Sequence, residues 1–415
     1  MSYRVAITGI GTLSSAGIGL QALWQACLDG QSGVKPITRF DASAYKVRIG
    51  AEVPEIPDLE ERLDPKLIKR ADPFVQYALY ATKLALEQSG LVIDESIADD
   101  VGVLVGSGIG GMKTWEDQHE ILLTRGPGRV SPFLVPMMII DMASGLISME
   151  TGARGPNLAV VTACATSTHA LGEAFEIIAR GAAKAMISGG TEAAITPTAM
   201  AGFASAGALS VRNDEPATAC RPFDRTRDGF VIGDGATIMV LEELEFARQR
   251  GANILGEIVG YGCSGDAYHI TAPCPDGGGA ARAMRAALRR AGIEPADIAY
   301  VNAHAPGTPG GDDMEARGLA QVFPPGTDGP LVSSTKSIHG HQLGATGASE
   351  LALTLRMLVE GVVPPTLNCH EPDEAVVSDI VMEEARRFEG IYGMSNSFGF
   401  GGHNAVLIVK KPTDD

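Results

Sequence analysis

The chain has 415 residues, is 45% hydrophobic and carries a formal net charge of −17 at neutral pH. A chain of this length can bury one large core or two joined halves. Its acidic balance argues against nucleic acid as a general partner, because phosphate binding needs a basic surface.

The six cysteines show neither the paired spacing of a zinc site nor a secreted disulfide framework. Residues 1–9 enter a predicted strand without the charged and then apolar pattern of a signal peptide. The apolar stretch 133–149 is interrupted by Pro136 and Asp141, so it falls short of a membrane span. We therefore expect a cytoplasmic protein without a membrane partner.

Apolar runs alternate with helical patterns along the chain, which predicts an α/β fold of sheets covered by helices. A first series ends near residue 255, and a second series of the same kind begins there. The two series are weak copies of one another, so we expect halves at 1–255 and 256–415. Strands are expected at 5–8, 101–105, 158–161, 185–188, 237–242, 258–262, 298–301, 331–333 and 405–409, and helices at 72–89, 166–180, 278–291 and 345–360.

One cysteine stands where chemistry is favoured. Cys164 follows the predicted buried strand 158–161 and precedes the predicted helix 166–180. Unpaired N–H groups at a helix start carry partial positive charge, so a thiol there ionises more easily and becomes a better nucleophile. A single cysteine is more often a small packing residue, so its role depends on the rest of the chain.

Three downstream segments carry groups that a thiol nucleophile could use. His304 follows the predicted strand 298–301, and the segment 333–347 contains Lys336 and His341. The segment 395–404 is a glycine-rich turn, whose backbone amides can approach a reacting carbonyl closely. A cysteine at a helix start, two histidines and such a turn together predict acyl-thioester chemistry.

Three other motifs are weaker. Gly9-Ile-Gly11 lacks the third glycine of a dinucleotide fingerprint and indicates a tight turn. The run 106–111 is a second glycine-rich loop after a strand. His339 and His341 could bind a metal, but no carboxylate or thiolate cluster joins them in the sequence, so no metal site is expected.

At Cys164, His304, His341 and the glycine-rich turn the chain resembles the β-ketoacyl-acyl carrier protein synthases of the Cys-His-His class. The resemblance covers nearly the whole chain, and the segments 220–235 and 265–273 are similar to the long-chain elongating branch. It implies a duplicated five-layered thiolase-like fold. It also implies substrates carried on the phosphopantetheine of acyl carrier protein, without a metal or organic cofactor.

The resemblance assigns a role to each site residue. Cys164 receives the acyl chain, and its N–H and that of Phe400 form the oxyanion hole, with the Phe400 ring as a gate to the acyl pocket. His304 and His341 are neutral donors to the enolate formed by decarboxylation. Lys336 orients His304, and the acidic supporting residue is Glu315.

Several residues depart from the commonest family pattern: Ala305-Pro306-Gly307 where Gly-Thr-Ser is common, His339 in place of a small or apolar residue, and His403 where threonine is frequent. They favour a specialised type II polyketide ketosynthase, of which one that makes a polyene chain is an example. The alternative is a housekeeping elongation enzyme of fatty-acid synthesis. A thiolase would need a second cysteine in the glycine-rich turn, and a non-catalytic chain-length-factor subunit usually lacks the nucleophile.

The resemblance also implies partners. We expect a homodimer, or a heterodimer with a chain-length-factor-like subunit, formed through the helix 72–89 and the strand before Cys164. Acyl carrier protein is acidic, so its docking on this acidic chain requires a local basic patch. We choose Arg62, Lys66, Lys69 and Arg70 over the rival set Arg282, Arg285, Arg289 and Arg290.

Overall fold

The computed structural model describes residues 2–324, 329–376 and 378–413. In the first half the strands lie in the order β6 (Asn157–Leu158), β5 (Val101–Gly106), β7 (Ala185–Glu192), β8 (Gly235–Glu243) and β1 (Val5–Ser14). The first three are parallel, whereas β8 runs antiparallel to both β7 and β1.

The second half repeats this order. Its strands are β11 (Leu331–Ser333), β10 (Ile298–Asn302), β15 (Tyr392–Gly399), β16 (His403–Lys410) and β9 (Gly256–Gly265), with β13 (Asp379–Ile380) beyond β11. The parallel and antiparallel pairings match the first half one by one. A short pairing of β1 with β9 joins the halves. The chain is therefore a duplication, as expected.

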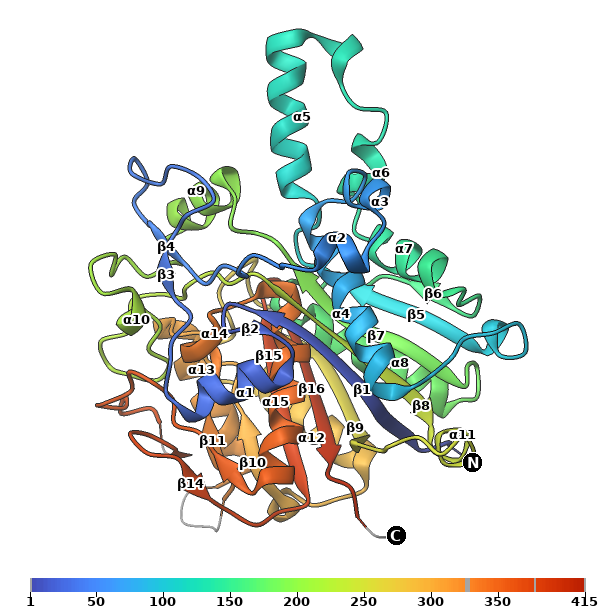
Figure 1. Cartoon of the computed structure of the whole chain (residues 1–415). Helices are drawn as coiled ribbons and strands as arrows, with labels where there is room; N and C mark the ends of the chain where they lie inside the picture. The colour runs from blue at the N-terminus through green and yellow to red at the C-terminus, as the bar shows by residue number, and fades with distance from the viewer. Residues whose placement is uncertain (1, 325–328, 377, 414–415) are drawn as a thin grey trace.

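Helices complete five layers (Figure 1). The middle layer consists of α8 (Thr166–Ala179) and α15 (Thr346–Glu360), which contact each other and both halves of the sheet. The outer layer of the first half contains α4 (Pro73–Ser89) and α7 (Met142–Thr151). That of the second half contains α12 (Gly278–Ala291) and α13 (Pro309–Val322). The expected α/β, thiolase-like architecture is confirmed.

Local sequence explains why α4 forms and packs closely. The Asp72 side chain accepts a hydrogen bond from Phe74 N, Pro73 occupies the first turn, and Gly90 ends the helix in a left-handed conformation. Gly11 on β1 lets the helix approach, because a Cβ there would lie 1.9 Å from the Ala81 carbonyl oxygen. The Gly9-Ile-Gly11 motif is thus part of a strand that packs against a helix and not a turn.

Shorter elements surround the layers. Helix α5 (Met112–Arg125) projects from the body beside α6 (Leu134–Met138) (Figure 1). No helix of the described residues is long and apolar enough to cross a membrane. The other elements are α1 (Leu20–Leu28), α2 (Leu59–Arg62), α3 (Pro65–Ile68), α9 (Pro197–Ser205), α10 (Pro216–Ala219), α11 (Leu244–Gln249), α14 (Lys336–His339), β2 (Gly17–Ile18), β3 (Lys35–Pro36), β4 (Ile49–Gly50), β12 (Val362–Val363) and β14 (Arg386–Arg387).

One predicted strand is wrong. Only Leu158 and the residue before it pair with β5, and residues 159–162 have no regular structure. Leu158 and Val161 are 48% and 51% exposed, so this segment is not a buried strand. Its apolar side chains lie at the open edge of the sheet. Helices α5 and α13 and strand β15 had no counterpart among the predicted elements.

Candidate active site

Cys164 lies in a tight turn at the start of α8. The 3₁₀ turn Ala163–Ala165 leads directly into the helix, and Ala163 adopts a φ of 50°. The Thr166 hydroxyl accepts from Thr162 N at 2.8 Å and donates to the Ala163 carbonyl at 2.7 Å. These contacts fix the strained turn, so the predicted position of the cysteine at a helix start is confirmed.

Both predicted histidines converge on this cysteine. His304 follows β10 and His341 follows α14, and both are buried. One ligand atom from each of Cys164, His304 and His341 lies within 4.8 Å of the others. The two imidazole rings meet edge to face, with centroids 5.4 Å apart. Four segments distant in sequence thus build one site, since Phe400 also lies beside the cysteine.

The site opens into a cavity of about 280 Å³. Its walls include the three converging side chains together with Phe230, Pro306, Thr308, Phe398 and Phe400. The mixture of apolar walls and a few polar groups is typical of a small-molecule site. Pro306 stands on this wall, so the unusual Ala-Pro-Gly sequence directly contacts the route to Cys164.

The electrostatics of the thiol differ from the prediction. Burial raises the pKa of Cys164 to about 12, although the Lys336 charge and a hydrogen bond from Phe400 N–H both lower it. The prediction that the helix start makes this thiol easy to ionise is therefore wrong for the free protein. The groups that favour the thiolate are present, but removal of the sulfur from water outweighs them.

Both histidines are neutral at neutral pH. Burial, assisted by the nearby Lys336 charge, holds the pKa of His304 and of His341 well below the usual range. His341 Nδ1 lies 3.0 Å from Thr346 Oγ1 at the start of α15. If the hydroxyl donates to Nδ1, His341 keeps its proton on Nε2, where it can be donated into the site.

Glu315 holds the backbone at His304. Its carboxylate accepts from His304 N at 2.9 Å, from Ala305 N at 2.7 Å and from Asn396 Nδ2 at 3.0 Å. All of these groups are buried. The Glu315 carboxylate thus holds the backbone at His304 and is not the ion-pair partner of Lys336.

The acidic partner of Lys336 is Glu350 on α15. Lys336 Nζ donates to Glu350 Oε1 at 2.5 Å, and both side chains are fully buried. No hydrogen bond to His304 is recorded for this lysine within the described residues, so orientation of the ring by Lys336 is not supported. Glu350 was missed, because only packing brings it, and not Glu315, to the ammonium group of Lys336.

A second missed network fixes the loop after His304. Arg227 is buried, and it pairs with Asp313 at 2.6 Å and Asp373 at 3.1 Å. Asp312 accepts from the backbone N–H groups of residues 223, 307 and 308. This loop forms one wall of the cavity. No local signal in the sequence marks this network, because Arg227 stands in the polar run 224–229 and its partners Asp313 and Asp373 are distant in the chain.

The glycine-rich turn brings backbone amides to the cysteine. Gly399 ends β15, and its ideal Cβ would lie 3.1 Å from Cys164 N and 2.7 Å from the Thr162 carbonyl oxygen. The Phe400 N–H is hydrogen-bonded to the Cys164 thiol. The Phe400 ring lines the cavity and is 37% exposed. The N–H groups of Cys164 and Phe400 therefore both lie beside the reacting sulfur.

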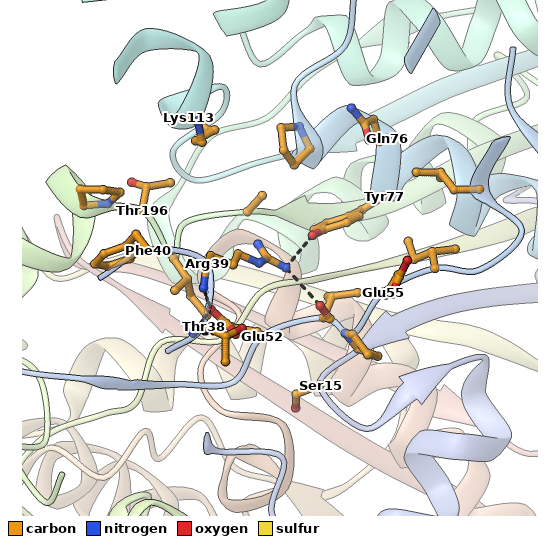
Figure 2. A pocket seen from close by; sticks show the side chains of 18 of the residues that line it. Ser15, Thr38, Arg39, Phe40, Glu52, Glu55, Gln76, Tyr77, Lys113 and Thr196 are labelled. Atoms are coloured by element: carbon orange, nitrogen blue, oxygen red, sulfur yellow. Dashed lines mark hydrogen bonds between the residues drawn. The ribbon is translucent and has the colours of Figure 1, made fainter. Parts of the chain in front are cut away.

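A larger cavity lies elsewhere in the described part of the molecule. It measures about 1270 Å³, and neither a cysteine nor a histidine lines it. Figure 2 shows Arg39 at its base, where Nη2 donates to the Tyr77 hydroxyl at 2.7 Å. Arg39 also pairs with Asp234. The guanidinium of Arg39 is thus occupied by hydrogen bonds and an ion pair within the chain. We assign the chemistry to the smaller cavity.

The donor atoms of Cys164, His304 and His341 form the one cluster among the described residues that could hold a metal ion. His339 is not part of it, because its Nε2 lies 3.1 Å from Thr335 Oγ1. The two histidines of the His-x-His motif therefore do not act as a chelating pair.

The duplicated five-layered fold and its cysteine with two histidines define a condensing enzyme of the thiolase-like class. Family models agree: residues 2–247 match the β-ketoacyl synthase N-terminal domain, and residues 255–370 match its C-terminal domain. The chain belongs to the β-ketoacyl synthase family. It is an acyltransferase.

Relatives cover the full length. The chain is 51% identical to 3-oxoacyl-[acyl-carrier-protein] synthase 2 of Staphylococcus aureus over 99% of both chains, and 51% identical to that of Synechocystis over 98% of both. Among solved structures, a β-ketoacyl synthase from Burkholderia phymatum has a TM-score of 0.92 at 35% identity, with 99% and 100% of the two chains covered. The ishigamide ketosynthase/chain length factor has a TM-score of 0.91 at 32% identity over 100% of both chains.

Gly399→Ala tests whether the open approach to Cys164 N is required. Both contacts of the added Cβ are backbone atoms, so relief requires movement of the turn. Loss of one oxyanion donor costs on the order of 3 kcal/mol, and we expect self-acylation of Cys164 to fall about 100-fold. Intact mass spectrometry after mixing with an acyl thioester measures this rate. Gly265→Ala on β9, which β16 separates from β15, is the control, because nothing lies within 4 Å of its Cβ.

Proposed function

We propose that this chain extends an acyl chain by two carbons through decarboxylative condensation with malonyl-acyl carrier protein. The observation that carries this proposal is a thiol and two neutral imidazoles within 4.8 Å, at the end of one cavity. Each step is redox-neutral and uses groups of the chain itself, so the proposed reaction requires no cofactor. The names of the relatives support acyl carrier protein as the substrate carrier.

The first step loads the acyl chain. The Cys164 sulfur attacks the carbonyl of the acyl thioester, and the negative oxygen of the tetrahedral intermediate accepts from Cys164 N–H and Phe400 N–H. The carrier thiol leaves with the proton that the cysteine gives up. Lys336 favours the thiolate that forms during attack, since its charge lowers the pKa of Cys164. In this proposal the Phe400 ring gates access to the sulfur.

The second step uses the histidines. Malonyl-acyl carrier protein loses carbon dioxide, and the negative charge of the resulting enolate accumulates on the thioester oxygen. His304 and His341 donate hydrogen bonds to that oxygen. The enolate carbon then attacks the acyl-Cys164 carbonyl, so that a carbon–carbon bond forms, the carbon–sulfur bond breaks, and the cysteine recovers a proton from water. Glu315 and Thr346 support the two histidines.

The pathway is best assigned to fatty-acid elongation. Identity is 51% to 3-oxoacyl-[acyl-carrier-protein] synthase 2, against 32% to the ishigamide ketosynthase/chain length factor. The relatives therefore favour the fatty-acid alternative over the polyketide ketosynthase that the unusual residues suggested. The polyketide function is kept as a second candidate because Pro306 lines the cavity, where it would narrow the choice of substrate.

A chain-length-factor role does not fit the site. Cys164, His304 and His341 are all present, and they converge in a cavity.

All six cysteines are free thiols, which is consistent with the cytoplasmic location expected from their spacing.

If Cys164 is the acylated residue, Cys164→Ala abolishes acyl loading. Incubation with acyl-acyl carrier protein and intact mass spectrometry should detect the acyl mass on the wild type and none on the variant. Cys263→Ala is the control, because Cys263 is exposed and is the cysteine that reagents reach most easily. An acyl adduct on Cys164→Ala would refute the assignment.

If the histidines act mainly on the enolate, His304→Ala and His341→Ala separate the two half-reactions. Each variant should lower malonyl decarboxylation and condensation at least 100-fold more than self-acylation, because enolate stabilisation belongs only to the later step. The rate of carbon dioxide release measures decarboxylation, and the rate of acyl loading measures self-acylation of Cys164. Equal losses in both would indicate a role in loading or folding.

Docking of the carrier is assigned to the basic patch near α3. Lys66 and Lys69 are exposed and form no ion pair with other described residues, although Arg62 of the same patch pairs with Asp58 and Glu87. In the rival set Arg290 pairs with Glu176 at 2.7 Å. Arg70 lies over the ring of Phe133. Free lysines suit a transient acidic partner.

Lys69→Glu with Arg70→Glu should raise the KM for acyl carrier protein about tenfold and leave acylation by a small-molecule thioester unchanged. Steady-state kinetics with both substrates test this. Arg285→Glu with Arg289→Glu is the matched control from the rival set. A KM effect in the control pair alone would move the docking surface to α12.

A homodimer is the proposed assembly, through a surface that keeps the expected strand before Cys164 but not the helix 72–89. Helix α4 packs within its own chain and contributes to the core, so it offers no broad face to a partner. Exposed apolar side chains recur along the chain from α5 to Cys164, including Leu123, Met149, Leu158 and Val161. The edge strand β6 lies among them with one side unpaired.

Light scattering after gel filtration should therefore give twice the chain mass. Leu158→Glu should shift the protein to monomer, since a stable interface buries more than about 1,200 Å² and cannot enclose an unpaired charge. The exposed Val92, which lies outside this surface, supplies the control Val92→Glu. A wild-type monomer that dimerises only with a second, different chain would favour the heterodimer.

A further inference from the structure

The duplication places a second turn opposite the cysteine turn. The 3₁₀ turn Leu343–Ala345 leads into α15 as Ala163–Ala165 leads into α8, and Leu343 adopts a φ of 46° where Ala163 has 50°. Gly344 is therefore the counterpart of Cys164. The helices begin with Thr346 and Thr166 at matching positions.

Strand pairing identifies the counterpart of Gly399. Strands β7 and β15 have eight residues each, and Ser188 pairs with Leu104 as Ser395 pairs with Asn302. The last residue of β15 is Gly399, and the last residue of β7 is Glu192. The equivalent position thus has no side chain in one half and a carboxylate in the other.

The Glu192 carboxylate fills the second turn. Oε2 accepts from Gly344 N at 2.9 Å and from Gly108 N at 2.7 Å. Oε1 accepts from the Ser107 hydroxyl at 2.7 Å and from Ile109 N at 3.1 Å. The residue is fully buried, and no ion pair with a basic side chain is recorded for it among the described residues. Burial raises the pKa of this carboxyl to about 7. Its oxygens occupy the position that the Cys164 turn keeps free for a substrate oxygen.

We propose that Glu192 is a positioning residue, which occupies the non-catalytic counterpart of the oxyanion hole and thereby clamps the loop 107–109 to the turn that follows His341. This inference rests on the proposed condensation for its kinetic consequence, but the clamp itself is a property of the fold. Nothing smaller than a carboxylate provides acceptors for four donors from two segments.

Both clamped segments pack near the nucleophile, because Ile109 and Leu343 belong to the same apolar cluster as Cys164. Gly344 lies between His341 and Thr346, the residue whose hydroxyl contacts His341 Nδ1. Release of Gly344 N would therefore loosen the support of the His341 ring. A misplacement of a reacting group by about 1 Å costs about 100-fold in rate.

Glu192→Gln tests the clamp in the full chain, because a glutamine has the same shape and only one acceptor oxygen. We expect the amides of residues 108, 109 and 344 to exchange with deuterium at least about tenfold faster. We also expect kcat for malonyl decarboxylation to fall about 100-fold, with KM for the malonyl carrier unchanged within about twofold. Ser107→Ala, which removes one donor, should give smaller changes in the same amides.

Glu242→Gln is the matched control, because Glu242 is a fully buried glutamate on β8 that binds Arg250. It should lower the melting temperature without selective exchange at residues 108, 109 and 344. Unchanged exchange at these amides in both Glu192→Gln and Ser107→Ala would overturn the proposal. The proposal would also be overturned if Glu192→Gln lost decarboxylation and acyl loading only in proportion to its lower melting temperature, as the control variant does. If the wild type fails to decarboxylate, the proposed function fails, and the amide exchange still decides the clamp.

Discussion

The close meeting of α8 and α15 at their N-termini is the constraint on which the site depends. Gly347 permits it, because a Cβ there would lie 1.9 Å from Thr168 Oγ1. Small hydroxyl groups complete the contact: Ser167 Oγ accepts from Ala348 N at 3.0 Å, and the Thr168 and Ser397 hydroxyls lie 2.7 Å apart. Cys164 and His341 stand just before these two helices. A larger residue at the crossing would separate the nucleophile from the imidazole, since interiors adjust poorly to added volume.

Buried charge is the second determinant, and its effect is indirect. Lys336 and Glu350 satisfy each other in a fully buried pair, which by itself contributes little to stability because desolvation offsets the attraction. The positive charge nevertheless acts on its neighbours: it favours the thiolate of Cys164 and holds the pKa of His304 and His341 low. One charge therefore favours both states that the reaction requires, an ionised sulfur and neutral imidazole donors. A residue in a buried ion pair can thus shift the pKa values of the reacting groups, although burial has the larger effect on each of them.

The sequence allowed the layers and the reactive residues to be predicted, but not the contacts between segments. Helix α12 has the predicted bounds, and α4 and α15 agree within one residue, because periodicity and glycine ends mark them locally. Residues 158–161 are apolar but lie at an edge, and apolarity alone does not separate a core strand from an exposed one. Cys164, His304 and His341 were found through motifs. The lysine partner Glu350 could not be distinguished from Glu315, because both lie on helices within 21 residues of Lys336 in the sequence and only packing brings one of them to its ammonium group.

The two halves show how one backbone arrangement can be open for chemistry or closed for structure. Each half presents a strained turn at a helix start beside the end of a strand, and the residue at that strand end decides its use. Gly399 leaves Cys164 N accessible, whereas the side chain of Glu192 reaches Gly344 N and fills the equivalent space. A free donor beside a nucleophile can stabilise a developing oxyanion, and the same donor bound to an internal carboxylate holds two loops together instead. The asymmetry lies in these side chains and not in the fold, so a duplicated architecture with two potential sites retains one.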